Sequence, residues 1–214
     1  MRTTRREFGP VLPDLRHRFV VSYIYELPVG RGRHFLGNLG SVADGIIGGW
    51  QIGGITSAQS GEAFTAGLSG DLSNTGSGSY RPNQIGDPYN FSIGQDVQAN
   101  LGCTPGHQTL QCWYNQAAFV APPLAPGQQV AHVFGNSRIG NLRGPHRFDT
   151  DLVLQKSFKL RETQHLEFRS EFFNILNHPN FGLPGNTVDE AGGASITNTA
   201  TDNRQIEFAL KYTF

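Results

Sequence analysis

The sequence has little of what marks a charged, helical or metal-binding protein. Among 214 residues there is one methionine and there are two cysteines, and the 17 Lys+Arg balance the 17 Asp+Glu. A balanced charge creates no field that would attract nucleic acid, so we expect no nucleic-acid partner. The apolar fraction of 37% is low for a domain that fills a core of its own. It suits a sheet of which one face lines a polar interior.

Long apolar runs are also missing. No stretch of about 18 apolar residues is present to form a membrane-spanning helix. The uncharged stretch Gly45 to Gly61 is interrupted by glycines and indicates a strand. The basic opening "MRTTRREFGPVLPD" is not followed by an apolar segment. We therefore expect no signal peptide in this chain.

Catalytic motifs are absent as well, since the sequence contains no G-x-S-x-G, P-loop or dinucleotide-binding fingerprint. Paired carboxylates could suggest a hydrolase, and four of them share strand faces with Arg147 and Arg169: Asp149, Asp151, Glu167 and Glu171. We interpret them instead as ion pairs between neighbouring strands that face a wet interior. The sequence thus predicts no enzyme, no catalytic residue and no cofactor.

The two cysteines, Cys103 and Cys112, lie in "CTPGHQTLQC" within a segment rich in proline and glycine. This spacing is typical of a local loop disulfide in an oxidising compartment, while two unrelated thiols remain the alternative. His107 and His132 are near in sequence, but no second paired motif completes a tetrahedral zinc site. No metal is expected.

What the sequence does have is apolar residues at every second position. Five segments show this pattern, near residues 17–27, 48–64, 146–160, 164–177 and 204–214. A period of two is the signature of a strand. The segments exceed the usual strand of roughly five or six residues and match the length of tilted membrane-spanning strands. Aromatic residues near the segment ends resemble the girdles of a lipid-facing barrel, and Arg and Glu on the other face suit a wet interior.

The connections between these segments are unequal in length. Only "RETQ" joins the third and fourth, whereas long loops are expected at 65–145 and 178–203. Short turns on one side and long loops on the other indicate a transmembrane barrel. The fold class is therefore all-β, an antiparallel transmembrane β-barrel segment of about five to seven strands, with a further hairpin in 65–145 left open. The connection 28–46 is long for the short-turn side and has room for a brief helix.

Several blocks of the chain resemble a known family. They are "RHRFVVSYIYELPVGRGRHF", "GGWQIGGITSAQSGEAFT", "FDTDLVLQKSF", "EFRSEFFNILNHPNFGLP" and "QIEFALKYTF". Together they resemble the C-terminal barrel portion of TonB-dependent outer-membrane receptors, in the group with an N-terminal carboxypeptidase-regulatory-like domain. The resemblance implies a 22-stranded barrel in the bacterial outer membrane, closed by a plug. It makes this chain a fragment, about the last quarter of such a receptor.

The resemblance also implies function and partners. The function would be energised uptake of a large, scarce substrate. The partners would be outer-membrane lipid, the remainder of the receptor barrel and plug, the barrel-assembly machinery, and TonB only through an N-terminal part. Four residues of the last strand would form the signal that the assembly machinery reads: Phe208, Leu210, Tyr212 and Phe214. No substrate-binding residue can be transferred.

Two other interpretations remain open. A soluble β-sandwich that binds a carbohydrate or another ligand shares the period-two pattern. In that protein Trp113, Tyr114 and Phe119 could stack on a sugar. Alternatively, the chain is a structural, porin-like or adhesin-like piece of an outer-membrane barrel.

Overall fold

The computed structural model describes residues 14–74, 76, 80–131 and 133–214; the basic opening, residues 1–13, lies outside them. The chain forms two compact units. The first, here called the sheet unit, comprises Arg18–Gln59, Arg147–Asn180 and Thr201–Phe214. The second, the loop unit, comprises the described residues of the segments 1–17, 60–146 and 181–200. None of the helices in the described part of the chain is long and apolar enough to cross a bilayer.

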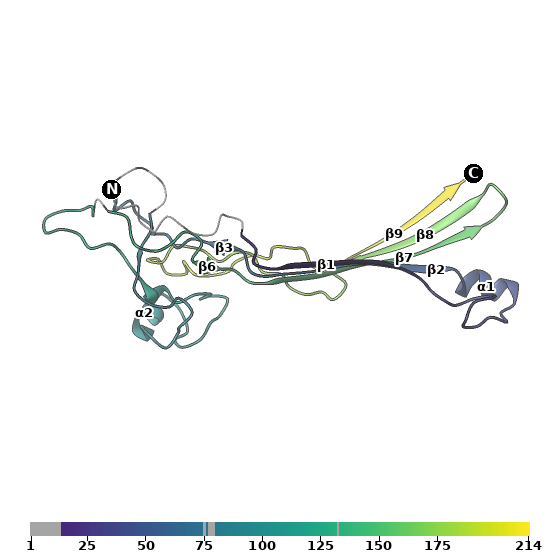
Figure 1. Cartoon of the computed structure of the whole chain (residues 1–214), viewed down its shortest axis with the longest axis horizontal. Helices are drawn as coiled ribbons and strands as arrows, with labels where there is room; N and C mark the ends of the chain where they lie inside the picture. Colours follow the sequence, from purple (N-terminus) through teal and green to yellow (C-terminus); the bar gives the residue numbers. More distant parts are fainter. Residues whose placement is uncertain (1–13, 75, 77–79, 132) are drawn as a thin grey trace. The chain divides into compact units, whose positions relative to one another are not determined.

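The sheet unit is built on one five-stranded antiparallel sheet with the order β1-β2-β7-β8-β9 (Figure 1). Its strands are β1 (Arg18–Glu26), β2 (Trp50–Gln59), β7 (Arg147–Lys159), β8 (His165–Phe173) and β9 (Gln205–Thr213). Each strand lies beside the next long strand along the chain. The all-β, antiparallel prediction is confirmed.

The register brings most of the large apolar side chains of the five strands onto one face. Ile52 of β2 lies opposite Tyr25 of β1 and Leu154 of β7. Phe168 of β8 lies opposite Leu210 of β9. Because side chains alternate between faces with a period of two, the residues between these positions share the opposite face.

Two strands end earlier than the sequence pattern suggests. β2 stops at Gln59 rather than near 64, and Ala63–Phe64 forms a separate short strand, β3, in the loop unit. β8 stops at Phe173 rather than near 177, because Asn174 adopts a left-handed conformation with φ of 47°. Asparagine tolerates this conformation, and here its side-chain oxygen accepts a hydrogen bond from the backbone N–H of His178 at 2.9 Å. Leu176, expected on the strand face, therefore lies in an exposed turn.

The loop unit has a small hydrophobic core of its own, although the sequence predicted long loops there and left open only a further hairpin. Its regular elements are short: β3 pairs with β6 (Leu142–Arg143), β4 (Asn83–Gln84) pairs with β5 (Phe119–Val120), and two single turns of helix are α2 (Gln95–Asn100) and η1 (Gln116–Ala118). Tyr114 lies at the centre of the core, with Phe64 and Phe119 at ring-centroid distances of 5.9 and 6.1 Å. The strands found among the described residues of 65–145 are only two residues long.

The connection between β1 and β2 contains the brief helix for which the sequence has room, α1 (Ser41–Ile47). Figure 1 shows it beyond the ends of these two strands. β2 itself carries two consecutive glycines, Gly53 and Gly54. A Cβ atom on Gly54 would lie 2.5 Å from the hydroxyl oxygen of Tyr23. The Tyr23 side chain of β1 thus lies across the space that a side chain at Gly54 would need.

Candidate functional site: a sheet with two unlike faces

One face of the sheet is apolar and uncovered. Its large side chains come from all five strands: Phe19, Val21, Tyr23, Tyr25, Trp50, Ile52, Phe148, Leu152, Leu154, Phe158, Leu166, Phe168, Phe172, Ile206, Phe208, Leu210 and Tyr212. Phe208 and Leu210 are 71% and 68% exposed. Soluble monomers seldom expose a continuous apolar patch larger than a few hundred Å². This face therefore requires an apolar environment.

A single lysine interrupts the apolar face. Lys156 lies in register between Trp50 of β2 and Phe168 of β8. Its Nζ lies 5.7 Å from the Trp50 ring centroid and 4.9 Å from that of Phe158, and it donates a hydrogen bond to the Gly48 carbonyl. The charge is thus covered by aromatic faces and paired with a backbone oxygen, which makes a lysine tolerable at this position.

The opposite face carries most of the charged side chains, beside exposed apolar ones such as Ile24 and Ile55. Glu26, Gln51, Gln155 and Arg169 form one row across four strands, in which the side chain of Gln155 donates to that of Gln51. Arg169 forms an ion pair with Glu171 of its own strand, β8. The expected ion pair between strands is not found at Glu171, because the register places Glu207 of β9 opposite it. Because the residue that faces Glu171 is also an acid, the cation that pairs with Glu171 is Arg169, two residues earlier on the same strand.

A shallow hollow of about 420 Å³ lies on the sheet unit, with Asp151, Gln155, Arg169 and Glu171 among its lining residues. These side chains offer a cation, carboxylates and an amide in an open space. They can hydrogen-bond to water, while Ile24, Ile55, Val153 and Phe173 make the rest of the lining largely apolar. Within the described part of the chain, no group of three or more His, Cys, Asp or Glu is arranged to hold a metal ion.

A sheet with an apolar, exposed face and a charged opposite face is the pattern of a barrel wall between lipid and water. The family model described as "Outer membrane beta barrel domain" matches residues 1–207. The chain belongs to this family. No curated protein and no solved structure gives a match. The prediction of an outer-membrane β-barrel is confirmed.

The four residues of the predicted assembly signal lie together at the end of the barrel sheet. Phe208, Leu210 and Tyr212 point to the apolar face from β9, and Phe214 follows the strand with 89% of its surface exposed. The rings of Tyr212 and Phe214 are stacked at 5.8 Å. Their recognition by the assembly machinery stays a prediction.

The loop unit places the predicted cysteine pair in a disulfide. Cys103 and Cys112 are bonded with their Cα atoms 5.6 Å apart, and both are buried. Tyr114 and Phe119, suggested above as sugar-stacking residues of a sandwich, are buried in the core. That suggestion is wrong for both, because a buried ring has no free face to offer.

Removal of the disulfide is expected to loosen this region of the loop unit. The double variant Cys103→Ser/Cys112→Ser opens a closed loop with a sequence separation of 9 residues, which should lower the free energy of unfolding by about 2–3 kcal/mol. The loss is measurable as faster hydrogen exchange in residues 98–116. The parent chain treated with reductant serves as the control and should exchange equally fast. Unchanged exchange in both samples would show that the bond adds no stability.

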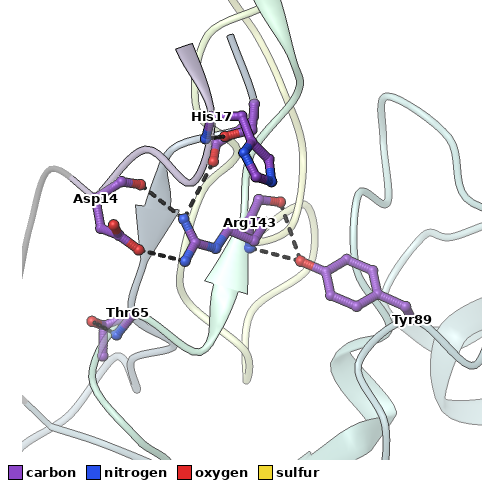
Figure 2. Close-up of polar contacts among 8 residues, drawn as sticks. Asp14, His17, Thr65, Tyr89 and Arg143 are labelled. Carbon is purple, nitrogen blue, oxygen red and sulfur yellow. Dashed lines mark hydrogen bonds and ion pairs between the residues drawn. The ribbon is translucent and has the colours of Figure 1, made fainter. Parts of the chain in front are cut away.

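Arg143 of β6 is the polar centre of the loop unit and was not predicted from the sequence. Its guanidinium donates to the backbone oxygen of Asp14 at 2.8 Å and to the carboxylate of Asp14 at 2.5 Å (Figure 2). A third donated bond, of 3.5 Å, goes to the carbonyl of Gly61. These partners lie far apart in sequence, so no local motif could have indicated the cluster.

The backbone of Arg143 is held from the other side by aromatic side chains. Its N–H donates to the hydroxyl oxygen of Tyr89 at 2.7 Å, and Tyr89 donates back to the Arg143 carbonyl at 3.2 Å (Figure 2). The same carbonyl accepts the indole N–H of Trp113 at 2.7 Å. Burial raises the pKa of Tyr89, so the hydroxyl stays protonated and can donate. Arg143 thus joins four segments of the loop unit, around Asp14, Gly61, Tyr89 and Trp113.

The variant Arg143→Met should lower the free energy of unfolding of the loop unit by about 1–2 kcal/mol, because it removes charge-assisted hydrogen bonds that are only partly exposed. The rate of limited proteolysis of the loop unit measures the loss. Arg143→Lys is the matched control: it keeps the charge but not the planar fork, and should fall between the parent and the methionine variant. Equal rates for all three chains would contradict a stabilising role.

Proposed function

We propose that the chain forms part of the barrel wall and the outer loops of a TonB-dependent outer-membrane receptor, which takes up a large, scarce substrate and has no enzymatic activity of its own. The observation that carries the proposal is the continuous apolar face over five long strands in a chain of the outer-membrane barrel family. The quoted sequence blocks, which resemble such receptors, support the finer assignment.

In this proposal the apolar face contacts lipid and the charged face lines the interior. β1 and β9 each have a long-strand neighbour on one side only. Lipid cannot satisfy the backbone N–H and C=O groups of an open edge. The remaining strands of the receptor barrel are therefore the proposed partners of these two edges, and the plug is the proposed partner of the interior.

The lengths of the connections give the proposed orientation. The N–H of Leu160 donates to the Gln164 carbonyl at 2.9 Å, and two longer backbone bonds join Arg161 and Gln164, so the turn from β7 to β8 is short and closed. The opposite ends of the strands have long connections: the chain leads from the C-terminal ends of β2 and β8 into segments of the loop unit. Since outer-membrane barrels have short periplasmic turns and long outer loops, the β7–β8 turn is assigned to the periplasm and the loop unit to the cell exterior.

A structural, porin-like or adhesin-like barrel piece is the second candidate. The two differ in their dependence on TonB and on the energised inner membrane. A soluble sandwich is less well supported, because its two sheets would bury the apolar face that is exposed here.

The proposal is tested in two steps. The purified chain should partition into detergent, and a monodisperse monomer in buffer without detergent would overturn the membrane assignment. The genomic region that encodes the chain should then be examined for an in-frame plug and TonB-contact segment. If they are encoded, deletion of the contact segment should abolish uptake while the barrel stays in the outer membrane. A barrel without such a segment would leave the porin-like or adhesin-like function.

A further inference from the structure

The connection between β1 and β2 is an ordered structure rather than a loose turn. The N–H of Gly30 donates to the Phe35 carbonyl at 3.0 Å, and the N–H of Phe35 donates to the Pro28 carbonyl at 2.9 Å. The carboxylate of Asp44 in α1 accepts the N–H of Arg31 at 2.5 Å. A Cβ atom on Gly48 would lie 2.5 Å from the same carboxylate, so glycine is needed for this close approach. α1 is thereby fixed to the start of the connection through its acidic side.

The apolar side chains of α1 point away from the protein. Val42 and Ile46, four residues apart and thus on one side of the helix, are 80% and 65% exposed. Asp44, two residues from each, lies on the other side and contacts the chain. In a water-soluble domain the apolar stripe of a helix faces the core. Here the arrangement is inverted, and Phe35 and Leu36 add two further exposed apolar side chains to the connection.

Two side chains of the apolar sheet face hold the C-terminal end of this helix. The indole N–H of Trp50 donates to the Ile46 carbonyl at 2.9 Å. The Nζ of Lys156 donates to the Gly48 carbonyl just beyond the helix. Both residues lie on the face assigned to lipid. The C-terminal end of α1 therefore adjoins the apolar face of the sheet.

We propose that α1 and the exposed residues Phe35 and Leu36 form an interfacial anchor that lies in the phospholipid leaflet on the short-turn side of the membrane. This inference rests on the proposed function, which assigns the apolar face to lipid. Basic groups flank the apolar side chains: Arg31, Arg33 and His34 are all exposed in the same connection. Arg33 also pairs with Glu26 at 3.2 Å, and Asp44 is the acid of the helix itself.

The chemistry of the connection matches the phospholipid surface. Interfacial helices combine apolar side chains that enter the boundary between headgroups and acyl chains with basic residues that meet phosphate. Trp50 supplies an indole at the end of the helix, as tryptophans at membrane interfaces do. The anchor also accounts for the length of a connection that a simple turn would have closed.

Site-directed spin labelling tests the anchor on the full chain inserted into vesicles of phosphatidylethanolamine and phosphatidylglycerol. Because Cys103 and Cys112 are bonded, a new single cysteine is the only free thiol. The labels are placed at Val42→Cys and Ile46→Cys on the apolar side of α1, and at Ser41→Cys outside it. Phe208→Cys on β9 reports the apolar sheet face. Collisions with oxygen, which concentrates in hydrocarbon, are compared with collisions with a water-soluble nickel complex.

Labels at 42 and 46 should collide preferentially with oxygen, as the label at 208 does, and the label at 41 should collide preferentially with nickel. Preference for nickel at 42 and 46 would place the helix in water. Shielding from both reagents would mean that a protein covers it, and oxygen preference at 41 would mean the wrong side faces lipid. Each of these results overturns the anchor. Oxygen preference at 208 would still support the assignment of the apolar sheet face to lipid. Nickel preference at 208 would overturn the proposed function itself.

Discussion

Phe208→Arg is expected to lower the free energy of unfolding of the membrane-inserted chain by about 2–4 kcal/mol, the cost of a cation on the lipid side of a barrel near mid-membrane. Phe208 lies near the middle of β9, projects from the apolar face, and stacks on Phe168 of β8 with ring centroids 6.3 Å apart. A guanidinium at this position loses its hydration and gains no acidic partner on that face. Urea titration of the chain in phospholipid vesicles measures the change.

The neighbouring position provides a matched control with the same new side chain. Glu207→Arg points to the charged face, where Glu207 lies opposite Glu171. It replaces two facing acids by a pair of opposite charge, so it should leave the free energy of unfolding unchanged or slightly raised. If the two arginine variants lose equal stability, the assignment of the two faces is wrong.

Tyr114→Ala is expected to destabilise the loop unit by about 3–5 kcal/mol, as large-to-small substitutions of buried aromatic residues do. Tyr114 has no exposed surface and packs against Phe64 and Phe119. Its hydroxyl also donates to the Gly193 carbonyl at 3.3 Å. Loss of the ring leaves a cavity between segments that are distant in sequence. All of these segments should then open in one cooperative step.

Hydrogen exchange followed by mass spectrometry resolves this effect along the chain. Exchange should accelerate in residues 63–68, 112–120 and 186–194, while the strands of the sheet unit keep their protection. Tyr114→Phe is the control, since it keeps the ring and removes only one long hydrogen bond; its loss should be about 1 kcal/mol. Unchanged exchange in Tyr114→Ala would mean that this core does not hold the loop unit together.

The sheet could be predicted from the sequence because its signal is local. Ile206, Phe208 and Leu210 alternate within a single strand, so the strand and its faces follow from period two alone. The ends of strands were harder to predict, because Asn174 stops β8 through a left-handed turn although the apolar pattern continues to Leu176. A pattern of hydrophobicity carries no information about backbone φ.

The core of the loop unit and its polar centre could not be predicted in this way. Phe64, Tyr114 and Val188 meet from three distant segments, each too irregular to show a period. Arg143 donates a hydrogen bond to Asp14, which lies 129 residues away in sequence. The orientation of α1 could not be predicted for a different reason. The sequence does not reveal whether its few apolar residues face a core or a membrane.

The glycine pair of β2 has a consequence for the curvature of the wall. Gly53 and Gly54 are adjacent, and the other four long strands contain no glycine. Strands bend most easily where side chains are missing, and designed barrels use such positions to close around a small radius. With Tyr23 lying across Gly54, even this site is braced. One braced bending point in five strands suits a wall of gentle curvature.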